Sequence, residues 1–153
     1  MSYKNIRFTI ENGVAGLVLA RHDIRNAYSD REFTDEIVDA INQAQRSAEA
    51  RVLVLSAEGS AFSAGGNIKD MRDQKGIFGG GPAAARRGYI EGIQQVPKAL
   101  YGLDIPSIAA VQGPAHLLLV EREGLLCCFS LLVEFGDRGL DRLVIPHLVH
   151  AHL

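Results

Sequence analysis

Residues 51–71 read RVLVLSAEGSAFSAGGNIKDM, and this stretch sets the fold class. The uniformly apolar run 52–55 is typical of a strand that is buried on both faces of a parallel sheet. Mostly small residues follow at 59–66, and Asn67 precedes the start of a helix. Such a turn exposes backbone N–H groups that can donate hydrogen bonds to an anion or a developing oxyanion. Glycines at such a turn also serve packing, so the stretch alone leaves both interpretations open.

The segments before this stretch predict a hairpin and a helix. Apolar residues alternate with polar ones over 6–10, Asn12-Gly13 supplies a turn, and an apolar run fills 14–19. Ser29 and Glu32 have the spacing of a capping box, which predicts a helix from Asp30 to about Glu49. The apolar positions of that helix recur with helical spacing at Phe33, Ile37, Ile41 and Ala44.

The segments after it predict a second helix and another buried strand. Residues 83–101 have helical periodicity, and Pro97 is expected to bend the helix. Residues 105–111 are apolar and are followed by Gln112-Gly113-Pro114, which predicts a strand that ends at this turn. Strands and helices that alternate in this order predict an α/β fold with parallel strand pairing.

The overall composition predicts an ordinary globular domain. The chain has 153 residues, 16.6 kDa and a formal charge of −2, which suits one domain and supplies no basic field for nucleic acid. The first residues of the chain do not resemble a secretion signal. The longest apolar run, residues 125–133, is too short to span a membrane. A cytoplasmic location is therefore expected. The adjacent Cys127 and Cys128 match neither a disulfide framework nor a zinc site.

Composition changes abruptly at residue 116. Residues 1–115 contain 17 Ala and 6 Leu, whereas residues 116–153 contain 1 Ala and 11 Leu. The change predicts two regions, of which the second is frame-shifted or disordered, with 125–135 forming a short apolar helix or aggregating. A rival interpretation is a metal site at His147, His150 and His152, but terminal histidines bind metal ions adventitiously, and no metal is assigned.

Three stretches resemble one known family. Residues 62–71, FSAGGNIKDM, resemble the first signature loop of the crotonase, or enoyl-CoA hydratase/isomerase, family. Residues 25–29, RNAYS, resemble the turn that begins its first long helix, and residues 106–115 resemble the strand that leads to its second signature loop. The resemblance implies the N-terminal half of a crotonase-like (ClpP/crotonase) spiral of β-β-α units over 1–115, with 116–153 as a tail that does not match.

The resemblance also implies a function and a set of site residues. Family members act on acyl-CoA thioesters, hydrating the double bond of an enoyl-CoA or shifting it, and stabilise an enolate between two backbone N–H groups. Gly66 corresponds to the first of these donors. The CoA-binding positions implied are Arg25, Asn26, Ala27, Ala64, Gly66, Asn67, Ile68 and Lys69. No cofactor is expected beyond the coenzyme A of the substrate, and relatives form homotrimers or hexamers.

The resemblance stops at Ala115. Relatives continue with a glycine cluster that supplies the second N–H, but this chain continues with residues 116–121, HLLLVE. Glu121 and Asp141 have the spacing of the catalytic carboxylates of hydratases without their flanking residues, so neither is assigned a role. The alternative is therefore an inactive acyl-CoA-binding remnant or an assembly partner of full-length homologues. A third alternative is that a half-core forms no stable protein.

Overall fold

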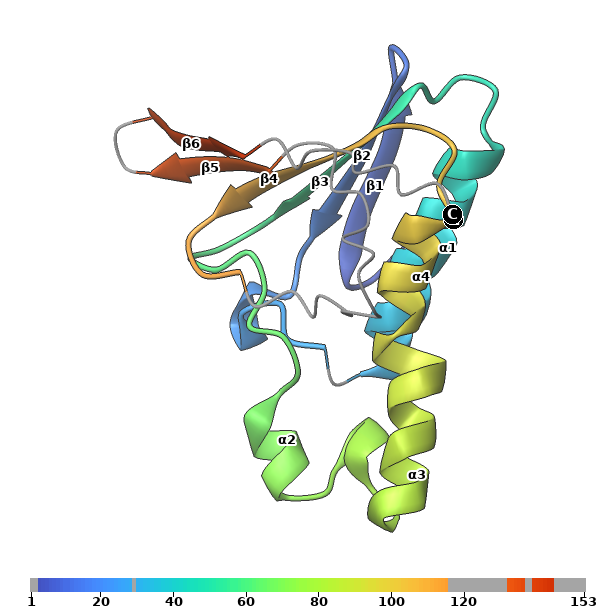
Figure 1. The fold of residues 1–153 in the computed structure, drawn as a ribbon, viewed down its shortest axis with the longest axis vertical. Helices are drawn as coiled ribbons and strands as arrows, with labels where there is room; N and C mark the ends of the chain where they lie inside the picture. The colour runs from blue at the N-terminus through green and yellow to red at the C-terminus, as the bar shows by residue number, and fades with distance from the viewer. Residues whose placement is uncertain (1–2, 29, 116–131, 137–138, 145–153) are drawn as a thin grey trace, which may run out of the picture.

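The computed structural model describes residues 3–28, 30–115, 132–136 and 139–144. A mixed sheet with the order β1-β2-β3-β4-β5-β6 carries its helices on one side (Figure 1). Strands β2 to β5 run parallel, and the outer pairs β1/β2 and β5/β6 are antiparallel. The predicted α/β class with parallel pairing is therefore confirmed.

The predicted N-terminal hairpin is confirmed. Strands β1 (Ile6–Glu11) and β2 (Val14–Leu19) pair with Ile6 opposite Leu19 and Glu11 opposite Val14. Both turn residues have positive φ, 52° at Asn12 and 83° at Gly13, which is the geometry that suits a tight two-residue hairpin turn.

Helix α1 (Arg31–Arg46) begins one residue later than the capping box predicts. Its N-cap is Asp30, whose carboxylate accepts a hydrogen bond from the backbone N–H of Glu32 at 3.0 Å, so the prediction of Ser29 as the cap is wrong. An aspartate suits this position because its charge also favours the positive end of the helix dipole. The side chain of Glu32 contacts Lys4 instead, at 3.0 Å.

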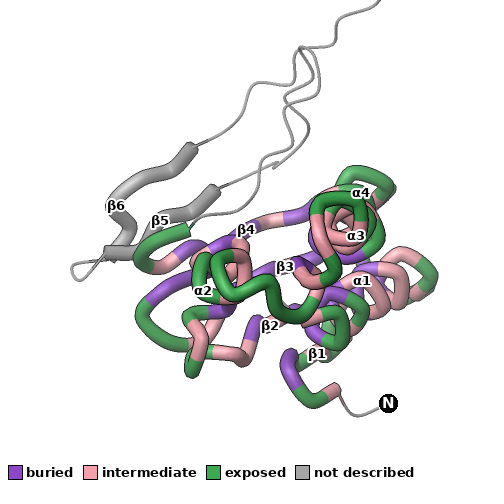
Figure 2. The backbone as a smooth tube through the Cα atoms, turned by 90° about the horizontal axis from the view of Figure 1, so that it is seen from below, coloured by how far each residue is buried: buried purple, intermediate pink, exposed green. Residues whose placement is uncertain are grey.

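Along strand β3 (Val52–Ala57) half-buried residues alternate with buried ones at 52–55, so the prediction that both faces of this strand are buried is wrong for one face. Strand β3 lies between β2 and β4 (Ser107–Gln112), and β3 and β4 correspond to the predicted strands 51–56 and 105–111. Between these two strands the chain forms α2 (Ile68–Arg72), a short 3-10 turn η2 (Gly76–Phe78), and a long irregular helix (Figure 1). The apolar sides of β1 to β4 pack against the helices, and the buried segments lie where strands and helices meet (Figure 2). The largest fully buried apolar side chains are Phe33, Phe62, Leu17, Leu19, Ile37, Ile41 and Leu53.

The long helix is interrupted before the predicted bend at Pro97. It consists of α3 (Gly81–Gly88), a π-helical segment η3 (Tyr89–Ile93) and α4 (Gln95–Tyr101). The N–H of Gln94 donates to the carbonyl of Tyr89 at 3.0 Å, which is the wide bond of a π turn. Pro97 has no N–H and its ring would crowd the carbonyl of Ile93, so the irregularity falls in the preceding turn.

Two more strands extend the sheet beyond residue 115. Strand β5 (Leu132–Gly136) pairs with β4, and β6 (Gly139–Val144) pairs with β5. The prediction of a helix over 125–135 is therefore wrong for 132–135, because β4 offers an edge whose backbone groups need partners. Residues 125–131 lie outside the described residues. No helix in the described part of the chain has the length and apolar character that crossing a membrane requires.

Candidate functional site

The small-residue loop after β3 is held between two distant segments. An isolated parallel bridge joins Gly66 to Tyr28, and another joins Ser63 to Ala115. The N–H of Tyr28 donates to the carbonyl of Gly65 at 2.7 Å, and the N–H of Phe62 donates to that of Pro114 at 3.0 Å. The three stretches that carry the family resemblance therefore come together in space.

Asn26 links two of these segments through its buried side chain. Its amide nitrogen donates to the carbonyls of Glu58 and Ala61, both at 3.0 Å, and its amide oxygen accepts from the N–H of Arg21 at 2.8 Å. The residue is fully buried with φ 52°, a conformation that asparagine tolerates better than most residues. The side chain thus positions the loop, and contact of Asn26 with CoA stays a prediction.

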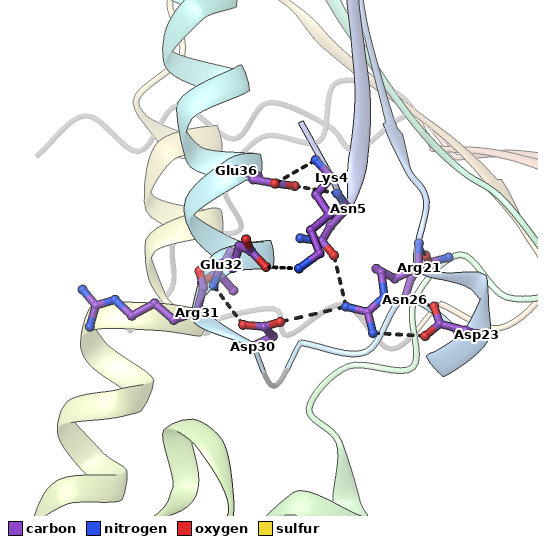
Figure 3. A network of polar contacts seen from close by, with 10 residues as sticks. Lys4, Asn5, Arg21, Asp23, Asn26, Asp30, Arg31, Glu32 and Glu36 are labelled. Carbon is purple, nitrogen blue, oxygen red and sulfur yellow. Dashed lines mark hydrogen bonds and ion pairs between the residues drawn. The ribbon is translucent and has the colours of Figure 1, made fainter. Parts of the chain in front are cut away.

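A network of charged side chains supports the turn that carries Asn26 (Figure 3). The guanidinium of Arg21 contacts both carboxylate oxygens of Asp23 at 3.0 Å and the amide oxygen of Asn5 at 3.1 Å. The Arg21 hydrogen bond holds the pKa of Asp23 below its ordinary value. The backbone N–H groups of Lys4 and Asn5 donate to Glu36, which ties the start of the chain to α1.

Ser63 fixes the shape of the loop from inside. Its hydroxyl donates to the carbonyl of Asn26 at 2.9 Å and accepts from the N–H of Gly65 at 3.1 Å. Gly65 has φ 72°, which a residue with a Cβ rarely adopts. This arrangement places the next peptide, that of Gly66, at the surface of the loop, where the residue is half-buried.

The backbone N–H of Gly66 has no acceptor among the described residues. A β-carbon on Gly66 would lie well inside the 3.0 Å that real contacts keep from the Met71 methyl, and 3.7 Å from the Phe78 ring. A side chain at this position would therefore displace the flexible end of Met71, and glycine allows the two residues to pack closely. The same absence of a side chain leaves the backbone open to a ligand, so the two interpretations of this glycine are compatible.

Some of the other predicted CoA-binding residues are exposed, and the rest are buried or make hydrogen bonds within the protein. Arg25 and Lys69 are exposed, and Ile68 has 78% of its surface exposed. The amide oxygen of Asn67 caps α2 by accepting from the N–H of Lys69 at 3.0 Å, and Ala27 is buried. Ala64 is half-buried, and its N–H donates to the carbonyl of Arg25 at 2.9 Å. Contact of these residues with CoA stays a prediction.

An apolar pocket lies beside the loop, between α2 and α3. Its volume is about 280 Å³, and the residues that line it are Met71, Gln74, Phe78, Gly81, Pro82 and Ala85. Met71 lines this pocket and also packs on Gly66, so the pocket adjoins this residue. No sequence pattern predicts the pocket, because its lining comes from α2, η2 and α3, and the way these short elements pack together is not a local property. The only local signal was the glycine run 79–81.

Tyr28 is fully enclosed behind the loop, and burial raises its pKa to about 12, although the side-chain interaction with Ser63 lowers it in part. Its ring stacks on Phe33 with a centroid distance of 5.6 Å. The phenol loses its proton near pH 10 in the unfolded chain and near pH 12 in the folded protein. The resulting stabilisation of the folded state is therefore complete below pH 10 and is lost as the pH rises from 10 to 12.

We therefore expect the free energy of unfolding to fall with pH by about 1.4 kcal/mol for each pH unit in this window through Tyr28. The Tyr28→Phe variant keeps the stacked ring but lacks the proton, so its stability should fall less steeply. Urea unfolding of both proteins at a series of pH values between 9 and 12 checks this. Equal slopes for the two proteins would contradict it.

Several other candidates fall outside this site. The described residues contain no group of three metal-ligating side chains. Glu121 and the histidines at 147, 150 and 152 lie outside the described residues, and Asp141 lies in β6.

Comparison with known proteins identifies related sequences. The sequence profile described as Enoyl-CoA hydratase/isomerase matches residues 9–116. A probable enoyl-CoA hydratase of Rhodobacter capsulatus is 32% identical over 115 residues, which cover 75% of this chain and 41% of that protein. A trans-2-decenoyl-[acyl-carrier-protein] isomerase of Streptococcus mutans is 33% identical over 72 residues, 47% of this chain and 27% of the relative.

Solved structures agree as well. The crystal structure of an enoyl-CoA hydratase/isomerase from Xanthobacter autotrophicus Py2 superposes with a TM-score of 0.63 at 30% identity, over 74% of this chain and 40% of that one. This chain thus spans less than half the length of these relatives. The predicted crotonase-like fold is confirmed, with partial coverage. The chain belongs to the enoyl-CoA hydratase/isomerase family.

Proposed function

We propose that this chain binds an acyl-CoA thioester with the carbonyl oxygen at the N–H of Gly66. The observation that carries the proposal is the pairing pattern around this loop. The neighbouring N–H groups of Phe62, Ala64 and Gly65 all donate within the protein, whereas that of Gly66 has no acceptor among the described residues. A donor that is fixed before the ligand arrives stabilises charge on the carbonyl oxygen without reorganisation, and one such donor contributes about 3–4 kcal/mol.

The neighbouring pocket supports an acyl group as the part of the ligand next to the carbonyl. Met71, Phe78, Pro82 and Ala85 make its lining largely apolar, and its volume of about 280 Å³ suits a short hydrocarbon chain. Burial of each methylene group there favours binding by about 0.8 kcal/mol. The exposed Arg25, Ile68 and Lys69 are available to the CoA moiety.

The reaction proposed is hydration of a 2-enoyl-CoA or movement of its double bond, with an enolate held at Gly66. It needs no cofactor beyond the coenzyme A of the substrate. A second candidate is thioester binding without turnover. It is favoured by the sequence after Ala115, which lacks the glycine cluster of relatives at 116–121.

A titration of the purified chain with butyryl-CoA and with free CoA tests the proposal. Tighter binding of the thioester is expected, and equal affinity for the two would overturn the role of Gly66. Crotonyl-CoA then separates the two candidates, because loss of its conjugated double bond on incubation supports catalysis. Binding of crotonyl-CoA that leaves the double bond intact supports the second candidate.

The contact between Gly66 and Met71 predicts coupling between these residues. In Gly66→Ala, the new methyl group displaces the end of the Met71 side chain, which lines the pocket. Because the end of a methionine side chain is flexible, the cost should lie at the low end for overpacking, about 1 kcal/mol, and we expect butyryl-CoA to bind more weakly because Met71 lines the pocket. Adding Met71→Ala removes the clash, so the double variant should be more stable than the sum of the two single changes implies. Urea unfolding of the four proteins measures this coupling, and simple additivity would contradict it.

A further inference from the structure

Tyr89 brings a side-chain hydroxyl to the loop at Gly66. A β-carbon on Gly66 would lie 3.6 Å from the Tyr89 hydroxyl oxygen. Tyr89 is the first residue of the π-helical segment η3, and it is half-buried. Segments of this type occur often at functional sites, because the extra residue in the turn changes the direction of a side chain.

The position of Tyr89 is set by close packing on both sides. Its ring meets that of Phe78 edge-on, with the centroids 5.5 Å apart and an angle of 60° between the planes. The preceding residue, Gly88, lies so close to the carbonyl of Ile77 that any β-carbon there would clash with backbone. The helix is thereby fixed against η2, and the ring cannot turn away from the loop without losing the contact with Phe78.

The Tyr89 hydroxyl has no hydrogen-bond partner among the described residues. Tyr3 differs in this respect, because its hydroxyl donates to Asp39 at 2.7 Å and accepts from Gln43. A phenol hydroxyl ordinarily finds a partner when it is held in a partly buried place. The Tyr89 hydroxyl is therefore a free donor that lies on the same side of the loop as the pocket residues Met71 and Phe78.

We propose that Tyr89 donates a hydrogen bond to the thioester carbonyl oxygen that is bound at the N–H of Gly66. This inference rests on the proposed function, since it assumes that the thioester binds there. Oxyanion sites combine donors, and tyrosine hydroxyls serve in them as well as backbone N–H groups. A side-chain donor has particular value in this chain, whose sequence after Ala115 has no glycine cluster.

The test compares two ligands that differ only in the carbonyl group. Butyryl-CoA carries the thioester carbonyl, and S-butyl-CoA is the thioether that lacks it. In Tyr89→Phe we expect butyryl-CoA to bind about 2- to 10-fold more weakly, the range for one neutral hydrogen bond, while S-butyl-CoA binds as before. Phenylalanine keeps the ring contact with Phe78, so the fold should be retained. Tyr3→Phe, which removes a hydroxyl at the far end of α1, is the matched control and should leave both affinities unchanged.

The outcomes separate this inference from the proposed function. If wild-type protein prefers butyryl-CoA to S-butyl-CoA and Tyr89→Phe shows the same preference, the role of Tyr89 is overturned while that of Gly66 stands. If the wild type does not discriminate between the two ligands, the proposed function itself fails. Equal weakening of both ligands by Tyr89→Phe would assign the residue to packing and would also overturn its role as a donor.

Discussion

An Asn26→Asp variant is expected to lose about 2–6 kcal/mol of unfolding free energy, or about 1–3 kcal/mol for each of two buried acceptors that lose their donor. The two acceptors are the carbonyls of Glu58 and Ala61, each 3.0 Å from the amide nitrogen of Asn26. A carboxylate oxygen in that place would repel both carbonyls. Aspartate has the same shape and a similar tolerance of positive φ, so the change replaces the N–H donors by a charged acceptor without altering packing or backbone conformation.

Asn67→Asp is the matched control for this experiment. Asn67 also uses its amide oxygen, to cap α2, but its amide nitrogen donates to no acceptor within the described residues. Aspartate caps helices as well as asparagine does, so this variant should stay within about 0.5 kcal/mol of the wild type. Urea unfolding followed by circular dichroism measures both. Similar losses in the two variants would show that the side chain of Asn26 does not hold the loop.

Gly113→Ala is expected to have the second large effect. Gly113 has φ 63°, and a β-carbon there would clash with the backbone carbonyl of Ser60. The backbone cannot move at Ser60 or at Gly113 without straining the bridge between Ser63 and Ala115, because this bridge follows a few residues later in both segments. We expect about 1–2 kcal/mol for the unfavourable φ and about 1–3 kcal/mol more for the clash.

Gly81→Ala separates these two contributions. Gly81 has φ 82°, but a β-carbon there would meet nothing within 4 Å. The Gly81→Ala variant should therefore lose only about 1–2 kcal/mol of unfolding free energy, which comes from the unfavourable φ. Thermal unfolding of both variants gives the difference, and a Gly113→Ala protein as stable as Gly81→Ala would refute the clash with Ser60.

The sequence predicted those elements whose signal is local. The hairpin at Asn12-Gly13 and the buried strand at 52–57 follow from a turn pair and from an apolar run, and neither depends on distant residues. The cap of α1 was predicted one position too early because Ser29 and Asp30 are both good cap residues. In the structure Asp30 is the cap, and its carboxylate also lies 3.9 Å from the guanidinium of Arg21. The π-helical segment was missed because its five residues are fewer than the window over which helical periodicity can be recognised.

The candidate site was only partly predictable for the same reason. The importance of Gly66 came from its resemblance to a family loop, and spacing alone left packing as an equal explanation. The internal role of Asn26 depends on carbonyls more than thirty residues away along the chain, which no local pattern reveals. Tyr89 lies within the helical periodicity of 83–101, and only the three-dimensional packing places its hydroxyl beside Gly66.

The two isolated bridges, Tyr28 with Gly66 and Ser63 with Ala115, also have a consequence for the order of folding. Each bridge joins residues that are far apart in sequence and so closes a long loop. The chain must lose the conformational entropy of that loop before the contacts at the bridge can stabilise it. The hairpin and α1 can form from neighbouring residues, but the loop at Gly66 gains its shape only after both β3 and β4 have joined the sheet. We therefore expect the loop at Gly66 to be among the last parts of the chain to form and among the first to open in local unfolding.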